Sequence, residues 1–183
     1  MKREKGFTLV ELLVVIAIIA LLMGILMPAL ARIRQIAYRL HCGTNLSGIG
    51  KAMLIYSSDF DDELPRAGFK NSVWAATIPN WRNVSRTAAF NSSRGSAASI
   101  TSNFFLLLKY AEVTPELFLC KGDSKIKEFK LSETDLADTG TQLIDCWDFG
   151  PTPQAHCSYS YHSPFGSFGL TSSSDPGMAM AGD

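Results

Sequence analysis

One acidic side chain lies in an otherwise apolar stretch close to the start of the chain. Glu11 is the only charged residue between Phe7 and Met27. A carboxylate at the centre of a membrane-spanning helix costs about 2.5–3.5 kcal/mol on insertion scales. Glu11 is therefore a side chain that needs a partner of opposite charge or has a task of its own.

The apolar stretch has the length of a transmembrane helix. A hydrocarbon core of roughly 30 Å is crossed by about 20 helical residues. Gly6 lies directly before the stretch, and the basic residues Lys2, Arg3 and Lys5 precede Gly6. Because positive charge stays on the cytoplasmic side, this order predicts a cytoplasmic N-terminus and an exported remainder of the chain.

The start of the chain resembles the prepilins of the type IV pilin-like family, which include the pseudopilins of type II secretion. A basic leader, a glycine, a Phe-Thr-Leu triplet and an acid precede a long apolar helix. The residues that carry the resemblance are Gly6, Phe7, Thr8, Leu9, Glu11 and, where many family helices have a proline, Pro28. The resemblance implies that a prepilin peptidase cuts between Gly6 and Phe7 and methylates the new amine of Phe7.

The resemblance also suggests a task for Glu11. Cleavage after Gly6 would leave a charged amine on Phe7, four residues before the acid. In a filament, Glu11 of one subunit would neutralise the Phe7 amine of a neighbour, and loss of either charge would strand the other in a poor dielectric. We therefore expect Glu11 to set the register of assembly.

Two other interpretations of the apolar stretch remain open. Ala29, Leu30 and Ala31 form an A-x-A site, which is typical of a signal peptide. However, the apolar run is longer than the roughly 7–15 residues of a signal peptide. A plain membrane anchor explains the length, but it explains neither Glu11 nor Gly6.

The helix is expected to continue beyond the membrane. Apolar residues recur at helical spacing after Arg32, and we predict one long helix over residues 7–58 whose second half packs on the head. Pro28 predicts a kink or local melting between Gly24 and Pro28, because proline lacks an N–H. Gly43 predicts a second place where the helix frays or bends.

Composition excludes several functional classes. The chain has 17 basic and 17 acidic residues, so it lacks the basic excess that nucleic-acid binding requires. No P-loop, dinucleotide-binding fingerprint or nucleophile elbow is present in the sequence. We therefore expect no enzymatic activity and no cofactor, whereas a head that binds carbohydrate or matrix through exposed Tyr and Trp stays open.

Four cysteines lie in the part of the chain that is expected to be exported. Cys42, Cys120, Cys146 and Cys157 allow three pairings, and spacing does not choose among them. No Cys/His spacing fits zinc. The resemblance extends to a class of pseudopilin-like proteins with a cysteine on the helix and another in a Phe-x-Cys-x-x-Asp stretch. It implies a Cys42–Cys120 disulfide, which would leave Cys146 and Cys157 for each other.

Calcium is the one metal that the resemblance brings into consideration. Major pseudopilins of type II secretion can bind calcium in a C-terminal loop, and the comparable acids here are Asp175 and Asp183. A second acidic cluster follows the helix at residues 59–63, but it lacks EF-hand spacing, and we interpret it as a solvated turn.

The head is predicted to combine one short helix with several strands. Ser102 or Asn103 is the expected cap of a buried helix over residues 102–111. Strands are expected at residues 117–120, 143–149 and 157–162, with a last edge strand near residues 178–180. Four large apolar side chains are expected to pin a polar loop to the core or to form an exposed recognition patch: Trp74, Ile78, Trp81 and Phe90.

Together these features predict an α+β, pilin-like fold, in which a long N-terminal helix packs on a small antiparallel sheet with irregular loops. We expect a leader (1–6), a helix (7–58) with a transmembrane and assembly segment (7–27), and a head (59–183). The expected function is a pseudopilin subunit in a type II secretion-like pseudopilus. A type IV pilus or DNA-uptake pilin is the alternative, and a membrane-anchored binding protein that never assembles is an alternative of another class.

The resemblance implies the partners and the location as well. The expected partners are prepilin peptidase, other pseudopilin subunits and the secretion platform of the inner membrane. We expect a single pass through the inner membrane, a periplasmic head and, after assembly, a place in the filament.

Overall fold

The computed structural model describes residues 7–83, 85–92, 95–134, 140–162, 164–165, 169–174 and 180–182. Residues 1–40 and 41–183 form two separate compact units. The first unit is helical in its described part, and the second is a mixed head that includes the remainder of the same helix. The α+β class and the long N-terminal helix are therefore confirmed.

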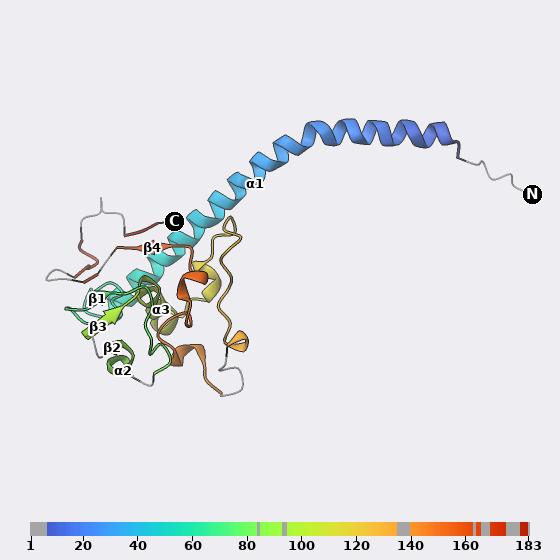
Figure 1. Cartoon of the computed structure of the whole chain (residues 1–183). Coiled ribbons are helices and arrows are strands. Elements are labelled where there is room, and N and C mark those ends of the chain that lie inside the picture. Colours follow the sequence, from blue (N-terminus) through green and yellow to red (C-terminus); the bar gives the residue numbers. More distant parts are fainter. Residues whose placement is uncertain are drawn as a thin grey trace, which may run out of the picture. The chain divides into compact units, whose positions relative to one another are not determined.

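Helix α1 runs from Leu9 to Asp59 without interruption (Figure 1). Its backbone stays helical through Pro28, so local melting between Gly24 and Pro28 does not occur. It also stays helical through Gly43, so the fraying expected there does not occur. Helix formation is cooperative, so losing one backbone hydrogen bond or accepting one glycine does not end a helix of this length.

The C-terminal part of α1 packs on the head through one face. Its buried residues recur three or four positions apart, which places them on one side of the helix. They are Cys42, Asn45, Ile49, Ala52, Met53, Tyr56 and Ser57. Gly48 brings the backbone of α1 close to Leu117, whose Cδ1 would lie 2.8 Å from a Cβ at this position. The helix therefore forms one wall of the core.

Helix α3, from Ile100 to Tyr110, is the centre of the head. Every residue from Thr101 to Leu107 is buried, so the helix has core packing on all sides. Phe105 contacts Phe149 edge to face at a centroid distance of 5.0 Å, and Phe149 contacts Phe118 at 5.5 Å. These aromatic contacts join the helix to loops that are far away in the sequence.

The helix begins earlier than the sequence predicts. Ser99 is its N-cap, and a reciprocal pair of hydrogen bonds between Ser99 and Ser102 forms a capping box. The expectation that Ser102 or Asn103 caps the helix is therefore wrong, although the helix itself is confirmed. Ser102 serves instead as the N3 partner of the cap.

Within the described part of the head, the strands are short and form two sheets. In the first sheet, β1 (Val73–Trp74) pairs parallel with β3 (Gly95–Ala98), which pairs antiparallel with β2 (Asn91–Ser92) (Figure 1). In the second, β4 (Ser160–Tyr161) pairs antiparallel with β5 (Ala181–Gly182). The prediction of one antiparallel sheet is therefore wrong in its detail, because one pairing is parallel and the strands belong to two sheets.

Several predicted strands are short helical turns instead. Residues 117–120 overlap the 3₁₀ helix η1 (Pro115–Phe118), and residues 143–149 begin with η3 (Leu143–Asp145). Of residues 157–162, only β4 is paired as a strand. Further turns are α2 (Arg86–Phe90), η2 (Leu131–Glu133) and η4 (Pro153–Ala155). Irregular backbone held by side chains therefore makes up much of the head.

Candidate functional site

The first turn of α1 is closed by two side chains, Thr8 and Glu11. The backbone N–H and the hydroxyl of Thr8 donate to Glu11 Oε2 at 2.8 and 2.6 Å. In return, the Glu11 backbone N–H donates to Thr8 Oγ1 at 3.3 Å. This is a capping box, which satisfies backbone donors that have no partner at a helix start.

Thr8 therefore has a role that the resemblance alone did not assign. The spacing Thr-x-x-Glu before an apolar run is the sequence signal of a capping box, so this role is readable from the sequence. Phe7 directly precedes the cap and is 71 % exposed. Gly6, the other residue of the expected cleavage site, lies outside the described residues.

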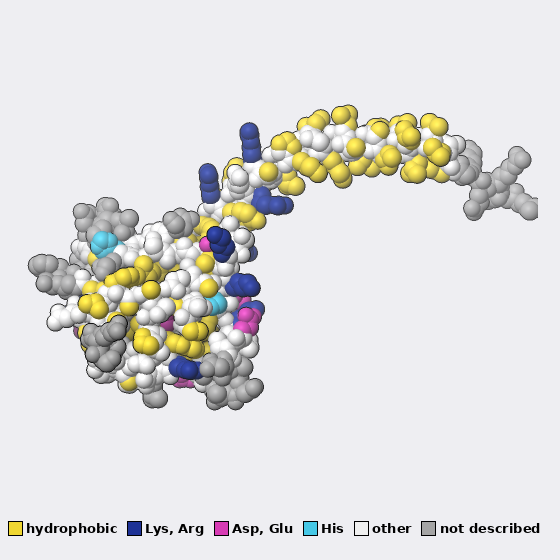
Figure 2. All heavy atoms as spheres, viewed as in Figure 1, with side chains coloured by type: hydrophobic (Ala, Val, Ile, Leu, Met, Phe, Trp, Pro, Cys, Tyr) yellow, Lys and Arg dark blue, Asp and Glu magenta, His cyan; other side chains and the backbone are white. Residues whose placement is uncertain are grey.

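The apolar segment of α1 is not buried by the described residues of its own unit. Every residue from 7 to 40 is exposed. Figure 2 shows hydrophobic side chains along the visible face of this segment, with Lys and Arg side chains after it. Among the described residues, α1 is long and apolar enough to cross a membrane by length and composition. This surface is therefore suited to lipid or to other apolar helices rather than to water.

A disulfide joins Cys42 on α1 to Cys120, which follows η1. This is the pairing that the resemblance implies, and it closes a sequence separation of 78 residues. Next to it, the Asn45 side-chain amide donates to the backbone oxygen of Leu119 at 2.8 Å. The disulfide and the hydrogen bond together hold the loop after η1 against the helix.

Cys146 and Cys157 do not pair with each other, so the second expected disulfide is absent. Both thiols are buried at separate positions: Cys146 Sγ points to Gln142 O, and Cys157 Sγ points to Tyr159 O. Burial raises the pKa of Cys146 to about 11 and that of Cys157 to about 12. These thiols are therefore packed and protonated, without the character of nucleophiles.

No metal centre is assembled by the described residues. Among them, no group of three His, Cys, Asp or Glu side chains could hold an ion. The calcium candidates Asp175 and Asp183 lie outside the described residues. A segment near the C-terminus braces the acidic turn after α1: Ser172 donates its backbone N–H to Asp62 O at 3.0 Å and its hydroxyl to Asp62 Oδ1 at 3.1 Å.

Among the described residues of the head, one carboxyl side chain is completely buried. Asp148 has no exposed surface, and it accepts hydrogen bonds from the Ser99 hydroxyl at 2.5 Å and the Phe149 N–H at 2.9 Å. Burial raises the pKa of the Asp148 carboxyl to about 7, although these hydrogen bonds act in the opposite direction. Asp148 is not among the residues predicted from the sequence, since no motif or spacing marks this acid as buried.

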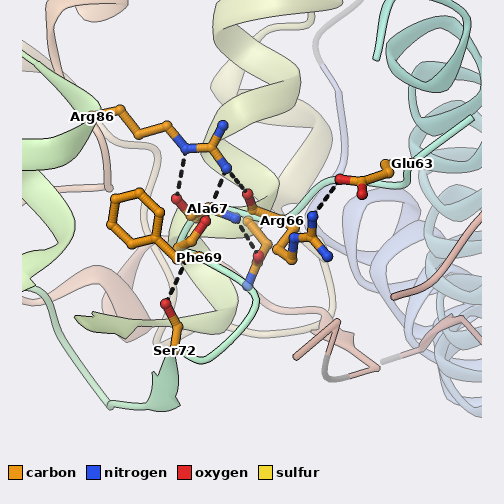
Figure 3. Close-up of polar contacts among 8 residues, drawn as sticks. Glu63, Arg66, Ala67, Phe69, Ser72 and Arg86 are labelled. Atoms are coloured by element: carbon orange, nitrogen blue, oxygen red, sulfur yellow. Dashed lines mark hydrogen bonds and ion pairs between the residues drawn. The ribbon is translucent and has the colours of Figure 1, made fainter. Parts of the chain in front are cut away.

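The loop that follows α1 is fixed by side chains from other elements. Arg86 donates to three successive backbone oxygens, those of Arg66, Ala67 and Gly68, at 2.6–3.2 Å (Figure 3). The Ser72 hydroxyl accepts the Phe69 N–H at 2.6 Å in the same loop (Figure 3). Residues 66–72 therefore keep a defined backbone although they form neither helix nor strand.

Three of the four apolar side chains that were expected to anchor the segment after this loop are buried, and one is exposed. Ile78, Trp81 and Phe90 are buried, with at most 5 % of their surface exposed. Trp74 is 47 % exposed, so it is not a core anchor. It lies on the edge strand β1, where the side chains of both strand residues are exposed.

Comparison with known proteins finds one match, at the N-terminus. Residues 1–27 match the family model described as the prokaryotic N-terminal methylation motif. This motif is the cleavage and methylation signature of type IV pilins and pseudopilins, and it confirms the resemblance drawn from Gly6, Phe7 and Glu11. No curated protein and no solved structure matches the chain.

Proposed function

Since residues 1–27 carry the signature of type IV pilin-like precursors, we propose that this chain is a pseudopilin of a type II secretion-like system. In this proposal, prepilin peptidase cuts between Gly6 and Phe7 and methylates the amine of Phe7. The processed subunit waits in the inner membrane with its head in the periplasm. It then enters a filament on the secretion platform together with other subunits, and it needs neither enzymatic activity nor a cofactor.

The observation that carries the proposal is the exposed apolar segment of α1. Residues 7–40 are all exposed, and they include a long series of Leu, Ile, Val and Met side chains. Exposure of such a surface to water is unfavourable at about 25 cal/mol per Å². Lipid covers it before assembly, and the helices of neighbouring subunits cover it afterwards. One surface therefore serves both states of the subunit.

Glu11 is positioned by its own helix to receive a second partner. Within the part of the chain that the structure describes, the side-chain hydrogen bonds of Glu11 all use Oε2. In the proposed filament, Glu11 Oε1 accepts a hydrogen bond from the Phe7 amine of a neighbouring subunit. Thr8 fixes the carboxylate through its hydroxyl and its N–H, so it acts as a positioning residue for this pair. The interaction satisfies two charges that would otherwise face a poor dielectric.

The choice of secretion over pilus formation depends on the head. The segment with Phe118, Cys120 and Asp123 resembles pseudopilin-like proteins, and its disulfide to Cys42 agrees with that resemblance. A balanced charge of 17 basic and 17 acidic residues gives no support to a DNA-uptake role. Deletion of the gene in its native host should therefore abolish export of specific proteins while surface pili persist.

A pair of substitutions tests the assembly role of Glu11. Glu11→Ala is expected to insert into the membrane and to be cut after Gly6, but to be missing from sheared filaments. Glu116→Ala changes an exposed acid of the head and should assemble as the native chain does. Normal incorporation of Glu11→Ala would refute the charge pairing, and failure of both variants would point to a general defect of the head.

A further inference from the structure

Three arginines follow the apolar segment of α1. Arg32 is the first charged residue after Glu11, and Arg34 and Arg39 follow it within about two helical turns. All three side chains are exposed. Figure 2 shows Lys and Arg side chains standing out from the helix where the hydrophobic segment ends. Helix α1 therefore carries a cluster of positive charge directly after its apolar segment.

This positive charge has no counter-charge within the helix. From Leu12 to Ser58, α1 contains no aspartate and no glutamate. Among the residues that the structure describes, none of the three arginines forms an ion pair. In the proposed orientation they also lie on the exported side, where basic residues after a span are disfavoured. An anionic partner outside the chain would compensate for both.

Helix geometry sets the distance between Glu11 and Arg32. The charge-free residues between them, 12–31, are helical throughout, so at 1.5 Å per residue they span about 30 Å. This length equals the thickness of a hydrocarbon core, which is roughly 30 Å. When these residues fill the core, Glu11 lies at its cytoplasmic boundary and Arg32 at its outer boundary. The carboxylate then avoids the cost of burial in lipid until the subunit leaves the membrane.

The headgroup layer then contains two of the three arginines. This layer extends about 5–7 Å beyond the core on each side. Along the helix axis, Arg32 and Arg34 lie about 2 and 5 Å beyond the outer boundary, whereas Arg39 lies about 12 Å beyond it. The Cα–Cβ bonds of a helix tilt toward its N-terminus, so the side chains of Arg32 and Arg34 lean back toward the membrane. Only Arg39 is out of reach of the headgroups.

Phosphate is the anion that matches both the side chains and their depth. A guanidinium group is planar, and it donates pairs of parallel hydrogen bonds to phosphate oxygens. Arg32 and Arg34 are two positions apart, so they project from roughly opposite sides of the helix. Lipid headgroups surround the helix on all sides at this depth, and they therefore reach both arginines at once.

We propose that Arg32 and Arg34 bind the phosphates of anionic phospholipids in the outer leaflet of the inner membrane, and we call these two residues the arginine collar. This inference rests on the proposed function, because it concerns the subunit that waits in the membrane. It places residues 12–31, rather than 7–27, in the hydrocarbon core before assembly. The collar holds the helix at the depth where Glu11 lies at the cytoplasmic boundary. Entry into the filament then requires the release of these lipids.

Lipid binding to the full-length chain tests the proposal. The chain is purified in a neutral detergent without phosphate, phosphatidylglycerol is added, and native mass spectrometry measures how much lipid is bound. The double variant Arg32→Gln/Arg34→Gln should bind about 25-fold more weakly, since each arginine at an anionic lipid surface contributes about 5-fold. Arg39→Gln is the matched control, because Arg39 lies about two turns further along the same side of the helix as Arg32. It should bind lipid as the native chain does.

Three results would overturn the proposal. In the first, Arg39→Gln loses as much affinity as the double variant, which would make the effect one of total charge and not of depth. In the second, a galactosyl diacylglycerol, which has no phosphate, binds as tightly as phosphatidylglycerol. In the third, the double variant keeps its lipid binding. If that variant were also missing from sheared filaments, the arginines would bind acidic groups of a neighbouring subunit instead.

The depth of the helix gives a second readout. Ala17→Cys or Leu22→Cys is introduced into the full-length chain, labelled with a nitroxide and reconstituted in phospholipid vesicles, where oxygen accessibility reports depth. The native cysteines are buried or joined in a disulfide, so the label attaches to the new thiol. Leu22 lies at the centre of residues 12–31, and Ala17 lies at the centre of residues 7–27. The label at position 22 should therefore be the deeper one, and a deeper label at position 17 would refute the depth that the collar sets.

The outcome also separates this inference from the function on which it rests. If the native chain forms filaments but the double variant binds phosphatidylglycerol normally, the collar fails and the pseudopilin function stands. If the native chain binds this lipid through the collar but forms no filaments in its own host, the proposed function fails and the lipid site stands.

Discussion

Replacement of Asp148 by asparagine should remove most of the pH dependence of head stability. Asp148 is fully buried beside Ser99, and its carboxyl accepts a hydrogen bond from the Phe149 N–H at 2.9 Å. Asparagine has nearly the same shape and keeps a carbonyl oxygen for the Phe149 N–H. The substitution therefore removes the ionisation of this side chain while it preserves packing.

The sign and size of the effect follow from the pKa of Asp148. Burial raises this pKa from its ordinary value of 3.8 to about 7 in the folded head. Between these values the folded state binds more protons than the unfolded state, so the free energy of unfolding falls as the pH rises. Three pKa units correspond to about 4 kcal/mol, lost between about pH 4 and pH 7.

Urea unfolding of the full-length chain in detergent measures this loss. The buried side chains of Trp81 and Trp147 make tryptophan fluorescence a probe of the head. Asp148→Asn should be more stable than the native chain at pH 8 and close to it at pH 4. Asp59→Asn, at an exposed position, should follow the native chain throughout. A native chain that gains stability relative to Asp148→Asn as the pH rises would refute the reasoning.

Three further substitutions test the helix contacts and the loop. Cys120→Ser should lower the free energy of unfolding by about 2–5 kcal/mol, because it removes the disulfide to Cys42, which links positions 78 residues apart in the sequence. Denaturation without reductant measures this loss. Gly68→Ala should destabilise the head by about 1–3 kcal/mol, since the new Cβ would meet Ser72, and a normal melting temperature would contradict the loop geometry. Thr8→Val should leave membrane insertion intact but reduce filament yield, and unchanged yield would remove its positioning role.

The long helix was predictable because its signals are strong and local. An apolar run followed by helical periodicity specifies α1 whatever surrounds it, and the predicted end at residue 58 lies one residue from Asp59. The buried helix over residues 102–111 was predictable for the same reason. Its cap was misplaced, because Ser99 and Ser102 are both serines and only their mutual bonds decide which of them caps.

The strands of the head were not predictable from periodicity. Strands β2 and β3 consist of Asn, Ser, Gly and Ala, which have low strand propensity. Their pairing depends on tertiary packing around Ser72 and Ala98. Conversely, residues 117–120 look like a strand, but Pro115 begins a 3₁₀ turn and the bond from Cys120 to Cys42 holds the segment.

The candidate site was predictable where chemistry depends on neighbours in sequence. Glu11 and Phe7 stand out in the sequence, and the capping role of Thr8 follows from the spacing Thr-x-x-Glu. The exposure of Trp74 and the burial of Asp148 depend on tertiary contacts. Asp148 lies between Trp147 and Phe149, and Trp74 follows Val73, so the local sequence does not tell which of these side chains is buried.

Mass spectrometry of the native N-terminus tests the central claim most directly. The full-length gene is expressed in its own host, and the protein is purified from membranes and from sheared filaments. The account predicts that both fractions begin with N-methylated Phe7, because cleavage creates the amine that Glu11 of a neighbour binds. A chain that begins with Met1 would indicate a plain anchor, and one that begins with Arg32 would indicate a signal peptide; either result would contradict the account.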